Sequence, residues 1–508
     1  MPSFISLIFI VCFSSLALWL LFQDNKEIRK YFGTSFGLSL FGYSAYYLLF
    51  PGPLGYFKLG IGIVMLFAGG FILNIFTSNK IVFVALFGAA VFGLWNMPEI
   101  PRIPFLFGTT AKSDLSALDP NFELLVEMKP GKKGADLEKI IKKYKLNYEP
   151  AFEVNSADLT DLDDYLAINI PETSLGDYDK IVSELQNSGL IDGLEQNEIV
   201  SLFKPVKVTK KKPSKGTKVL NDPELDKVWG YDALQMNELH KFLAEKNIKP
   251  AKRAKIAIID TGVDSHHEDL SANFISTRVE YDEDPQGHGT HCAGIAAAVS
   301  NNGKGVASLF PSKEFVEVTS IQVFPRNGGT TQRIIIRGMI LAADNGADVL
   351  SMSLGGPSSD AAQRAYKEAV SYANKKGAIV VVAAGNEDVD ARTKVPASVE
   401  GVICVAAVDE NLKKASFSND VSKIKMGIAA PGVNIYSSMP DSRYDYMSGT
   451  SMATPYVAGL LGLMKSIEPT LSTEKAFSII NKTAIKTASG NSTGQFIQTF
   501  AVISDLLK

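Results

Sequence analysis

Charged residues are nearly absent from the first 100 positions, and this constrains the fold of the chain more than any other feature. The region holds eight of them: Asp24, Lys26, Glu27, Arg29, Lys30, Lys58, Lys80 and Glu99. With 51 basic and 54 acidic residues in all, the rest of the chain has the charge density of an ordinary soluble protein. The sequence therefore predicts a membrane region joined to a globular region, and excludes a wholly soluble enzyme and a disordered chain. A net charge of −3 gives no field that would recruit nucleic acid.

Four apolar segments within residues 1–98 have the length of a membrane-crossing helix, about 17–25 residues. They are Ser3–Phe22, Tyr31–Phe50, Leu59–Thr77 and Ile81–Met97. The densest basic cluster lies in the first connection, which predicts that this connection is cytoplasmic. Four spans that start outside end outside, so a multi-pass membrane protein with an extracytoplasmic globular region is expected. No Asp, Glu or His occurs between Ile28 and Pro98, which favours an anchor over a transporter.

A small domain is expected at residues 121–203, after a linker at residues 99–120. Its patterns run strand, helix, strand, strand, helix, strand, with the second strand near Ala151–Val154 and the last over Ile191–Leu202. This βαββαβ order predicts a ferredoxin-like domain. It contains no His or Cys, so no catalytic role of its own is expected. Residues 204–220 follow as a basic linker with seven lysines and no acid.

Residues 221–508 alternate apolar, β-branched runs with helical patterns. This predicts a three-layer α/β domain with a mostly parallel sheet. Four runs are typical of buried strands: Ile256–Ile259, Val349–Met352, Ala378–Ala383 and Val402–Val408. Two further stretches are typical of helices: Asp360–Lys375 and Met452–Ile467.

Three passages of this domain carry residue types used in catalysis. Asp260 ends an apolar strand, where open α/β sheets bind ligands, although an acid after a strand is also common turn chemistry. His288 lies between two glycines that open access to its ring, although a surface histidine near a helix start is the plain alternative. His291 adds a second candidate metal ligand, but no companion cluster and no zinc pattern accompany the pair. Ser451 stands at the start of an apolar helix. A serine at this position can be an N-cap, or it can be a nucleophile beside free N–H groups.

Together and in this order, the passages resemble the motifs of the subtilisin-like serine proteases. The matching segments are Asp-Thr-Gly-Val-Asp from Asp260, Gly-His-Gly-Thr-His-Cys-Ala-Gly around His288, Gly-Thr-Ser-Met-Ala-Thr-Pro around Ser451, and Ala-Ala-Gly-Asn ending at Asn386. The resemblance covers residues 221–483 and implies a subtilisin-like fold and a serine endopeptidase that forms an acyl-enzyme. It implies Ser451 as nucleophile, His288 as general base, Asp260 as the residue that orients His288, and Asn386 as oxyanion donor. It implies no cofactor for catalysis.

The resemblance also implies where a polypeptide substrate binds. The cleft walls are matched by Ser353, Leu354, Gly355, Ala384 and Gly385. His-Cys-Ala-Gly, Ala391-Arg392 and the short stretch Asn386–Pro396 are most similar to the proteinase K-like branch, which implies an apolar or aromatic residue before the cut. Asp269 matches one ligand of a family calcium site, so the resemblance leaves a structural calcium ion open without supplying a complete ligand set.

Residues 121–203 look like the family's inhibitor-type propeptide, an intramolecular partner that plugs the cleft until it is cut away. A permanently attached spacer is the alternative. The leading hypothesis is a membrane-tethered serine endopeptidase made as a self-processing zymogen, cut between Phe203 and Asn221. The competing hypothesis is an inactive protease-like binding or scaffold protein in a membrane assembly, which the four intact catalytic positions disfavour.

Overall fold

The computed structural model describes residues 115–200, 202–203, 206, 219–326, 329–358 and 363–508. All of them fall within residues 113–508, one of the two units into which the chain divides. The four predicted membrane spans lie outside the described residues. No helix among those described has both the length and the apolar character needed to cross a bilayer.

A seven-stranded sheet forms the centre of the large domain, residues 219–508. All neighbouring strands in it are parallel, which confirms the predicted mostly parallel sheet. In spatial order the strands are β17 (Gln495–Phe496), β14 (Gly427–Pro431), β13 (Val402–Val408), β11 (Ile379–Ala383), β9 (Val349–Met352), β6 (Ala254–Asp260) and β7 (Val316–Gln322). The four predicted strands are β6, β9, β11 and β13, which differ from their expected bounds by at most two residues at either end.

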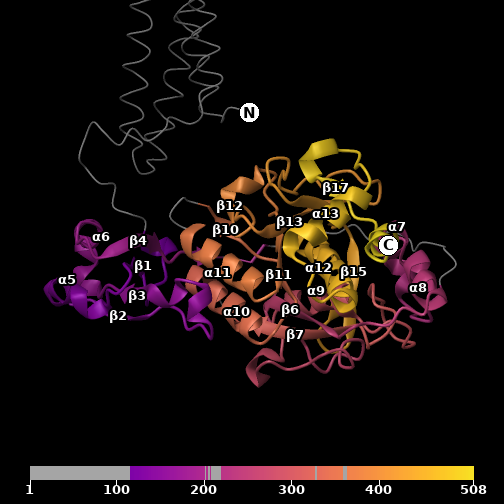
Figure 1. Ribbon diagram of the computed structural model, residues 1–508, viewed down its shortest axis with the longest axis horizontal. Helices are drawn as coiled ribbons and strands as arrows, with labels where there is room; N and C mark the ends of the chain where they lie inside the picture. Colours follow the sequence, from indigo (N-terminus) through magenta and orange to yellow (C-terminus); the bar gives the residue numbers. More distant parts are fainter. Residues whose placement is uncertain (1–114, 201, 204–205, 207–218, 327–328, 359–362) are drawn as a thin grey trace, which may run out of the picture. The chain divides into compact units, whose positions relative to one another are not determined.

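Helices cover both faces of this sheet, so the domain has three layers (Figure 1). Successive side chains of a strand point to opposite faces, and in β6 Ile256 and Ile258 join one apolar cluster while Ala257 and Ile259 join the other. The first cluster contains α9 (His288–Ala297) and α12 (Thr450–Ile467). The second contains α10 (Gln332–Asp344) and α11 (Gln363–Lys375). Both faces are therefore buried, as continuous apolar strands require.

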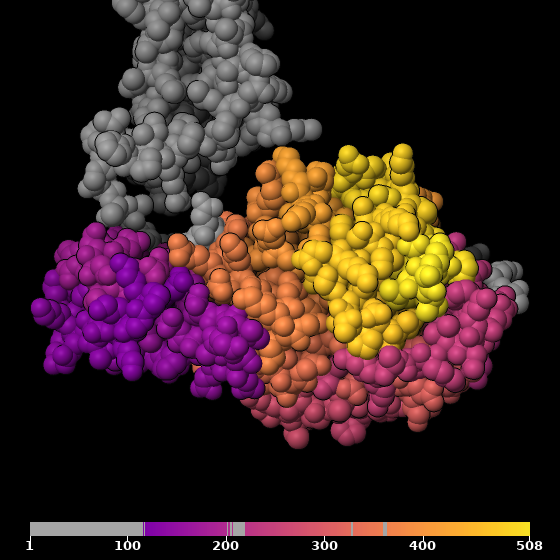
Figure 2. Space-filling model, viewed as in Figure 1, coloured from indigo at the N-terminus to yellow at the C-terminus, as the bar shows by residue number. Residues whose placement is uncertain are grey.

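The remaining helices and short strands lie around these layers. They are α7 (Trp229–Ala233), α8 (Met236–Glu245), β8 (Thr330–Thr331), β10 (Gly356–Pro357), β12 (Lys394–Val395), β15 (Ile435–Met439), β16 (Arg443–Met447), α13 (Thr473–Thr483) and α14 (Thr499–Leu506). The C-terminal α14 packs on α8 through an edge-on contact of Phe242 and Phe500, with ring centroids 5.4 Å apart. The last helix of the large domain thus lies beside α8, close to the start of that domain (Figure 2).

The small domain, residues 115–203, has the expected order of elements. They are β1 (Leu124–Met128), α5 (Glu138–Tyr144), β2 (Asn147–Pro150), β3 (Tyr165–Asn169), α6 (Tyr178–Gln186) and β4 (Ile191–Gln196). The four strands pair antiparallel in the order β2-β3-β1-β4. Its two helices and one sheet face enclose a core of their own.

Two predicted strands of the small domain were placed wrongly. The second strand lies at β2, before Ala151–Val154, because Lys145 adopts a left-handed conformation (φ 54°) that ends α5 and lets the strand begin two residues later. The last strand does not continue to Leu202. It stops at Gln196, and β5 (Ile199–Val200) leaves the small sheet to pair with β8 of the large domain.

Candidate active site

Asp260 and His288 meet at the carboxyl end of the central sheet. Asp260 is the last residue of β6 and His288 the first of α9, and His288 Nδ1 lies 2.7 Å from Asp260 Oδ1. Both side chains are buried. Burial alone would lower the pKa of His288, but the negative charge of Asp260 and the hydrogen bond to it outweigh burial and raise that pKa well above its usual 6.5. The charged form of His288, which arises when the ring takes up a proton, is therefore stabilised at this position.

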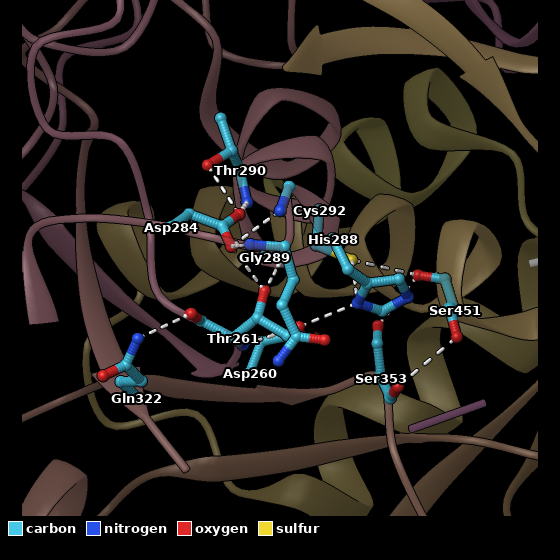
Figure 3. Close-up of polar contacts among 12 residues, drawn as sticks. Asp260, Thr261, Asp284, His288, Gly289, Thr290, Cys292, Gln322, Ser353 and Ser451 are labelled. Atoms are coloured by element: carbon cyan, nitrogen blue, oxygen red, sulfur yellow. Dashed lines mark hydrogen bonds and ion pairs between the residues drawn. The ribbon is translucent and has the colours of Figure 1, made fainter. Parts of the chain in front are cut away.

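Asp284 links the segments that carry these two residues, and sequence reasoning missed it (Figure 3). One of its oxygens accepts from Thr261 Oγ1 and Gly287 N, each at 2.8 Å. The other accepts from the backbone N and the Oγ1 of Thr290, also at 2.8 Å. Because Thr261 follows Asp260 and Thr290 lies in the first turn of α9, one buried carboxylate fixes both sides of the Asp260–His288 pair. Asp284 stands four residues before the start of α9, outside the N-cap position that Gly287 occupies, so no capping pattern marked it in the sequence.

Ser451 lies in the first turn of α12, one residue inside the helix. The helix begins at Thr450, two residues earlier than predicted, after the N-cap Gly449. Ser451 Oγ donates to the carbonyl of Ser353 at 3.3 Å, and Ser353 Oγ donates to the carbonyl of Ser451 at 2.8 Å. His288 Nε2 has no hydrogen-bond partner among the described residues. The His288 ring lies between Asp260 and Ser451 (Figure 3), so an unpaired imidazole nitrogen faces a hydroxyl group.

Asn386 presents an amide donor beside the same helix start. Its Oδ1 accepts from the N and the Oγ1 of Thr450, both at 2.9 Å, which fixes the orientation of the amide group. Its Nδ2 is buried and unpaired within the described part of the chain. A fixed, unpaired donor is suited to an oxygen that gains negative charge during a reaction. Thr450, which positions this amide, was not singled out from the sequence.

Two of the predicted cleft-wall residues, Leu354 and Gly355, lie against a bound segment of the same chain. Leu202 forms an antiparallel bridge with Leu354, and β5 pairs antiparallel with β8. Phe203 is 6% exposed, and a Cβ placed on Gly355 would lie 2.8 Å from its Cζ. Ala384 and Gly385 directly follow β11 and precede Asn386. An extended peptide that pairs by its backbone along the wall formed by Leu354 and Gly355 matches strand-addition recognition.

One cluster in the described part of the chain has the residue types of a metal site, and it coincides with this site. Ligand atoms of Asp260, His288 and Cys292 lie within 4.8 Å of one another. Asp260 and His288 are already joined through Nδ1, and burial raises the pKa of the Cys292 thiol. His291 makes no pair with His288, because its Nε2 lies 3.2 Å from the carbonyl of Asp445. The geometry favours proton transfer over metal binding.

Comparisons with known proteins agree with this geometry. Residues 251–500 match the Subtilase family. Thermitase from Thermoactinomyces vulgaris is 44% identical over 225 residues, which cover 43% of this chain and 77% of thermitase. Subtilisin DY from Bacillus licheniformis is 40% identical over 237 residues, which cover 45% and 83% of the two chains.

Two solved structures are similar in fold. The crystal structure of fervidolysin from Fervidobacterium pennivorans has a TM-score of 0.61 at 24% identity and covers 76% of this chain and 61% of that one. A protease from Pseudoalteromonas arctica has a TM-score of 0.50 at 30% identity, and the match covers 57% of this chain and 100% of that one. The chain therefore belongs to the subtilase family and is a serine endopeptidase of the subtilisin type.

Proposed function

We propose that the enzyme is a membrane-tethered zymogen in which Ser451 attacks the peptide carbonyl and forms the acyl-enzyme. His288 takes the proton of the hydroxyl group through Nε2 and returns it to the leaving amine. Asp260 holds the ring through Nδ1 and stabilises its charged form. The placement of an unpaired Nε2 beside Ser451, with Nδ1 at 2.7 Å from Asp260, supports these roles.

Asn386 is proposed to stabilise the oxyanion together with the N–H of Ser451. Replacing Asn386 with alanine removes the side-chain donor proposed for this role and is expected to lower kcat by about 10²–10³ while KM changes little. Steady-state hydrolysis of a fluorogenic peptide measures both constants. Asn345→Ala is the matched control, since this exposed amide at the end of α10 only donates to the carbonyl of Leu341. Equal losses in the two variants would contradict the assignment.

The segment in the cleft supports self-processing between Phe203 and Lys204. In a strand bound antiparallel to Leu354, Phe203 is the residue that reaches Gly355 and is buried there. The chain beyond the bond is held too, since Val206 N donates to the carbonyl of Ser448 at 2.8 Å. The small domain is then a ferredoxin-like, inhibitor-type propeptide. An aromatic residue before the cut agrees with the proteinase K-like features around Ala391-Arg392.

Mass spectrometry of the purified chain tests this assignment. The wild type is expected to yield a fragment that begins at Lys204, whereas Ser451→Ala remains one chain. Fragments that begin at another residue would assign the cut to another bond. An uncut wild-type chain, or a cut Ser451→Ala chain, would contradict self-processing.

The membrane tether is supported by the four apolar segments within residues 1–98 and their scarcity of charge. The basic cluster in the first connection supports an extracytoplasmic catalytic domain. Intact Ser451→Ala chain is expected to stay with membranes through an alkaline carbonate wash. Recovery of the intact chain in the wash would contradict the membrane tether.

A structural calcium ion is proposed near Asp222 and Asp269. Both carboxyl groups are buried, and burial raises the pKa of Asp269 to about 8, with the charge of Asp222 adding to the shift. Asn302 lies between them: its Nδ2 donates to Asp269 at 2.8 Å and its N to Asp222 at 3.1 Å. Carboxylate oxygens are ligands that calcium prefers, so Asp222 and Asp269 fit the ion. Asn302 turns a donor nitrogen toward Asp269 and its Oδ1 accepts from Lys304 N, so the two acids would hold the ion.

Chelation is expected to destabilise the enzyme without touching its chemistry. In the Ser451→Ala chain, which cannot digest itself, removal of calcium should lower Tm by roughly 5 °C or more, because an ion bound only by the folded state stabilises it. Differential scanning calorimetry with and without a chelator measures the shift, and Asp269→Asn should abolish it. An unchanged Tm, or the same shift in Asp269→Asn, would contradict the site.

A further inference from the structure

Phe203, the residue before the proposed cut, lies against the start of β10 and close to β12. A Cβ placed on Gly355 would be 2.8 Å from Phe203 Cζ and 3.0 Å from the carbonyl oxygen of Val395. The strands β10 and β12 pair antiparallel, with Pro357 opposite Lys394 (Figure 1). Lys394 is therefore the immediate neighbour of a residue that lies beside the Phe203 side chain.

Glu387 follows directly after the oxyanion donor Asn386, and its carboxylate turns back toward the predicted cleft wall. Its Oε2 accepts from Asn419 Nδ2 at 3.1 Å and would lie 2.8 Å from a Cβ placed on Gly385. The same Asn419 amide donates to the carbonyl of Ala384 at 2.8 Å and accepts from Glu387 N at 3.1 Å. The carboxylate is therefore held beside the segment that carries Asn386.

An ion pair joins these two segments. Lys394 Nζ lies 3.1 Å from Glu387 Oε1, and the Lys394 side chain is only 16% exposed. Charges that are shielded from water act strongly on a third charge placed near them, unless they offset each other. The other two acids of the stretch 386–396 have cations of their own, Asp388 with Lys414 and Asp390 with Arg392. The surroundings of Phe203 thus hold one positive and one negative charge that balance.

We propose that Lys394 and Glu387 determine which residue the enzyme accepts before the cut, because each cancels the charge of the other. A neutral aromatic side chain then fits the site. A lysine or glutamate side chain meets one like charge and one opposite charge, and gains no net attraction to offset the loss of its water. If one member of the pair is removed, the other is uncompensated, so a lone carboxylate should favour lysine and a lone ammonium group should favour glutamate. The proposal rests on the function proposed above, since it takes Phe203 as the residue before the cut.

Substitutions of opposite sign test the proposal. The full chain is folded intact, cut by a site-specific protease at a recognition sequence inserted between the two domains, and separated from the small domain. Three peptides share the sequence of residues 199–202 and carry phenylalanine, lysine or glutamate before a fluorogenic leaving group. For each enzyme, kcat/KM of the lysine and glutamate peptides is divided by kcat/KM of the phenylalanine peptide. Because both values come from one preparation, any misfolded fraction cancels in the ratio.

The two single variants should change these ratios in opposite ways. Lys394→Met should raise the ratio for the lysine peptide at least about tenfold, and Glu387→Gln should raise the ratio for the glutamate peptide by a similar factor. The double variant has neither charge and should keep both ratios within about threefold of the wild type. Lys425→Met is the matched control, since it removes the same charge from an exposed pair with Glu400 at 2.9 Å, and should also stay within about threefold.

Three results would overturn the proposal. They are a wild type that prefers the lysine or glutamate peptide to the phenylalanine peptide, single variants whose ratios stay at the wild-type values, and a Lys425→Met shift equal to that of Lys394→Met. A failure of the proposed function is seen separately, because it appears as a wild-type fragment that begins at a residue other than Lys204, whatever the behaviour of the pair.

Discussion

Replacing Ser451 with alanine is expected to lower kcat by about 10⁶ and leave substrate binding nearly intact. Alanine removes the oxygen that forms the acyl-enzyme, while the cleft walls and the N–H groups of α12 remain. Because the variant would not cut itself, both enzymes are cut by an added site-specific protease at a recognition sequence inserted between the two domains. The catalytic domain is then separated from the small domain before kcat and KM are measured with a fluorogenic peptide.

Ser437 supplies the control for this prediction. It is another buried serine, and its Oγ donates to the carbonyl of His291 at 2.9 Å. Ser437→Ala should keep kcat within about tenfold, since it loses one neutral hydrogen bond. A fluorophosphonate probe, which reacts only with an activated serine, should label the wild type and Ser437→Ala but not Ser451→Ala. Labelling of Ser451→Ala, or no labelling of the wild type, would favour the inactive scaffold protein.

Replacing Asp260 with asparagine is expected to lower kcat by about 10⁴ and shift the pH profile. The charge of Asp260 holds the pKa of His288 well above 6.5. A general base works only when neutral, so wild-type kcat/KM should rise with pH through a midpoint above 6.5. Without the negative charge the pKa of His288 falls, and the acid limb should move to lower pH although the rate is smaller at every pH. Hydrolysis rates between about pH 5 and 10 measure both effects.

Asp264→Asn is the control because it changes an acid four residues away in the same motif. Asp264 accepts from the N–H groups of His266 and Asp441, and within the described part of the chain it forms no hydrogen bond or ion pair with His288. Its replacement should leave the midpoint of the acid limb unchanged. A midpoint that stays in place in Asp260→Asn, or a loss of kcat smaller than about tenfold, would contradict the role of Asp260.

The parts of the site that the sequence could predict are those carried by short motifs. Asp260 ends β6, His288 and Ser451 lie in the first turns of helices, and Asn386 follows β11 by three residues, so the local pattern limits where each side chain can lie. Thr450 and Asp284 were missed because their roles depend on partners in other segments. The central strands were predictable because continuous apolar runs mark strands buried on both faces.

The fold of the small domain and its docking were harder to predict. Apolar residues recur up to Leu202 in the predicted strand Ile191–Leu202, and only the pairing of β5 with β8 shows that its last part leaves the small sheet. The contact between Arg333 and Ala151 joins residues 182 positions apart, and nothing local distinguishes this arginine from a solvated one. The membrane spans stay a prediction, since they lie outside the described residues.

The segment Ile199–Phe203 is also a starting point for inhibitor design. Its backbone already pairs with β8 and with Leu354, and its last side chain fills a buried site at Gly355. A synthetic pentapeptide of this sequence with an aldehyde in place of the final carboxyl group would keep that pairing and offer Ser451 a carbonyl carbon. The resulting hemiacetal would place its oxygen toward Asn386, so the chain itself encodes the scaffold of a reversible covalent ligand.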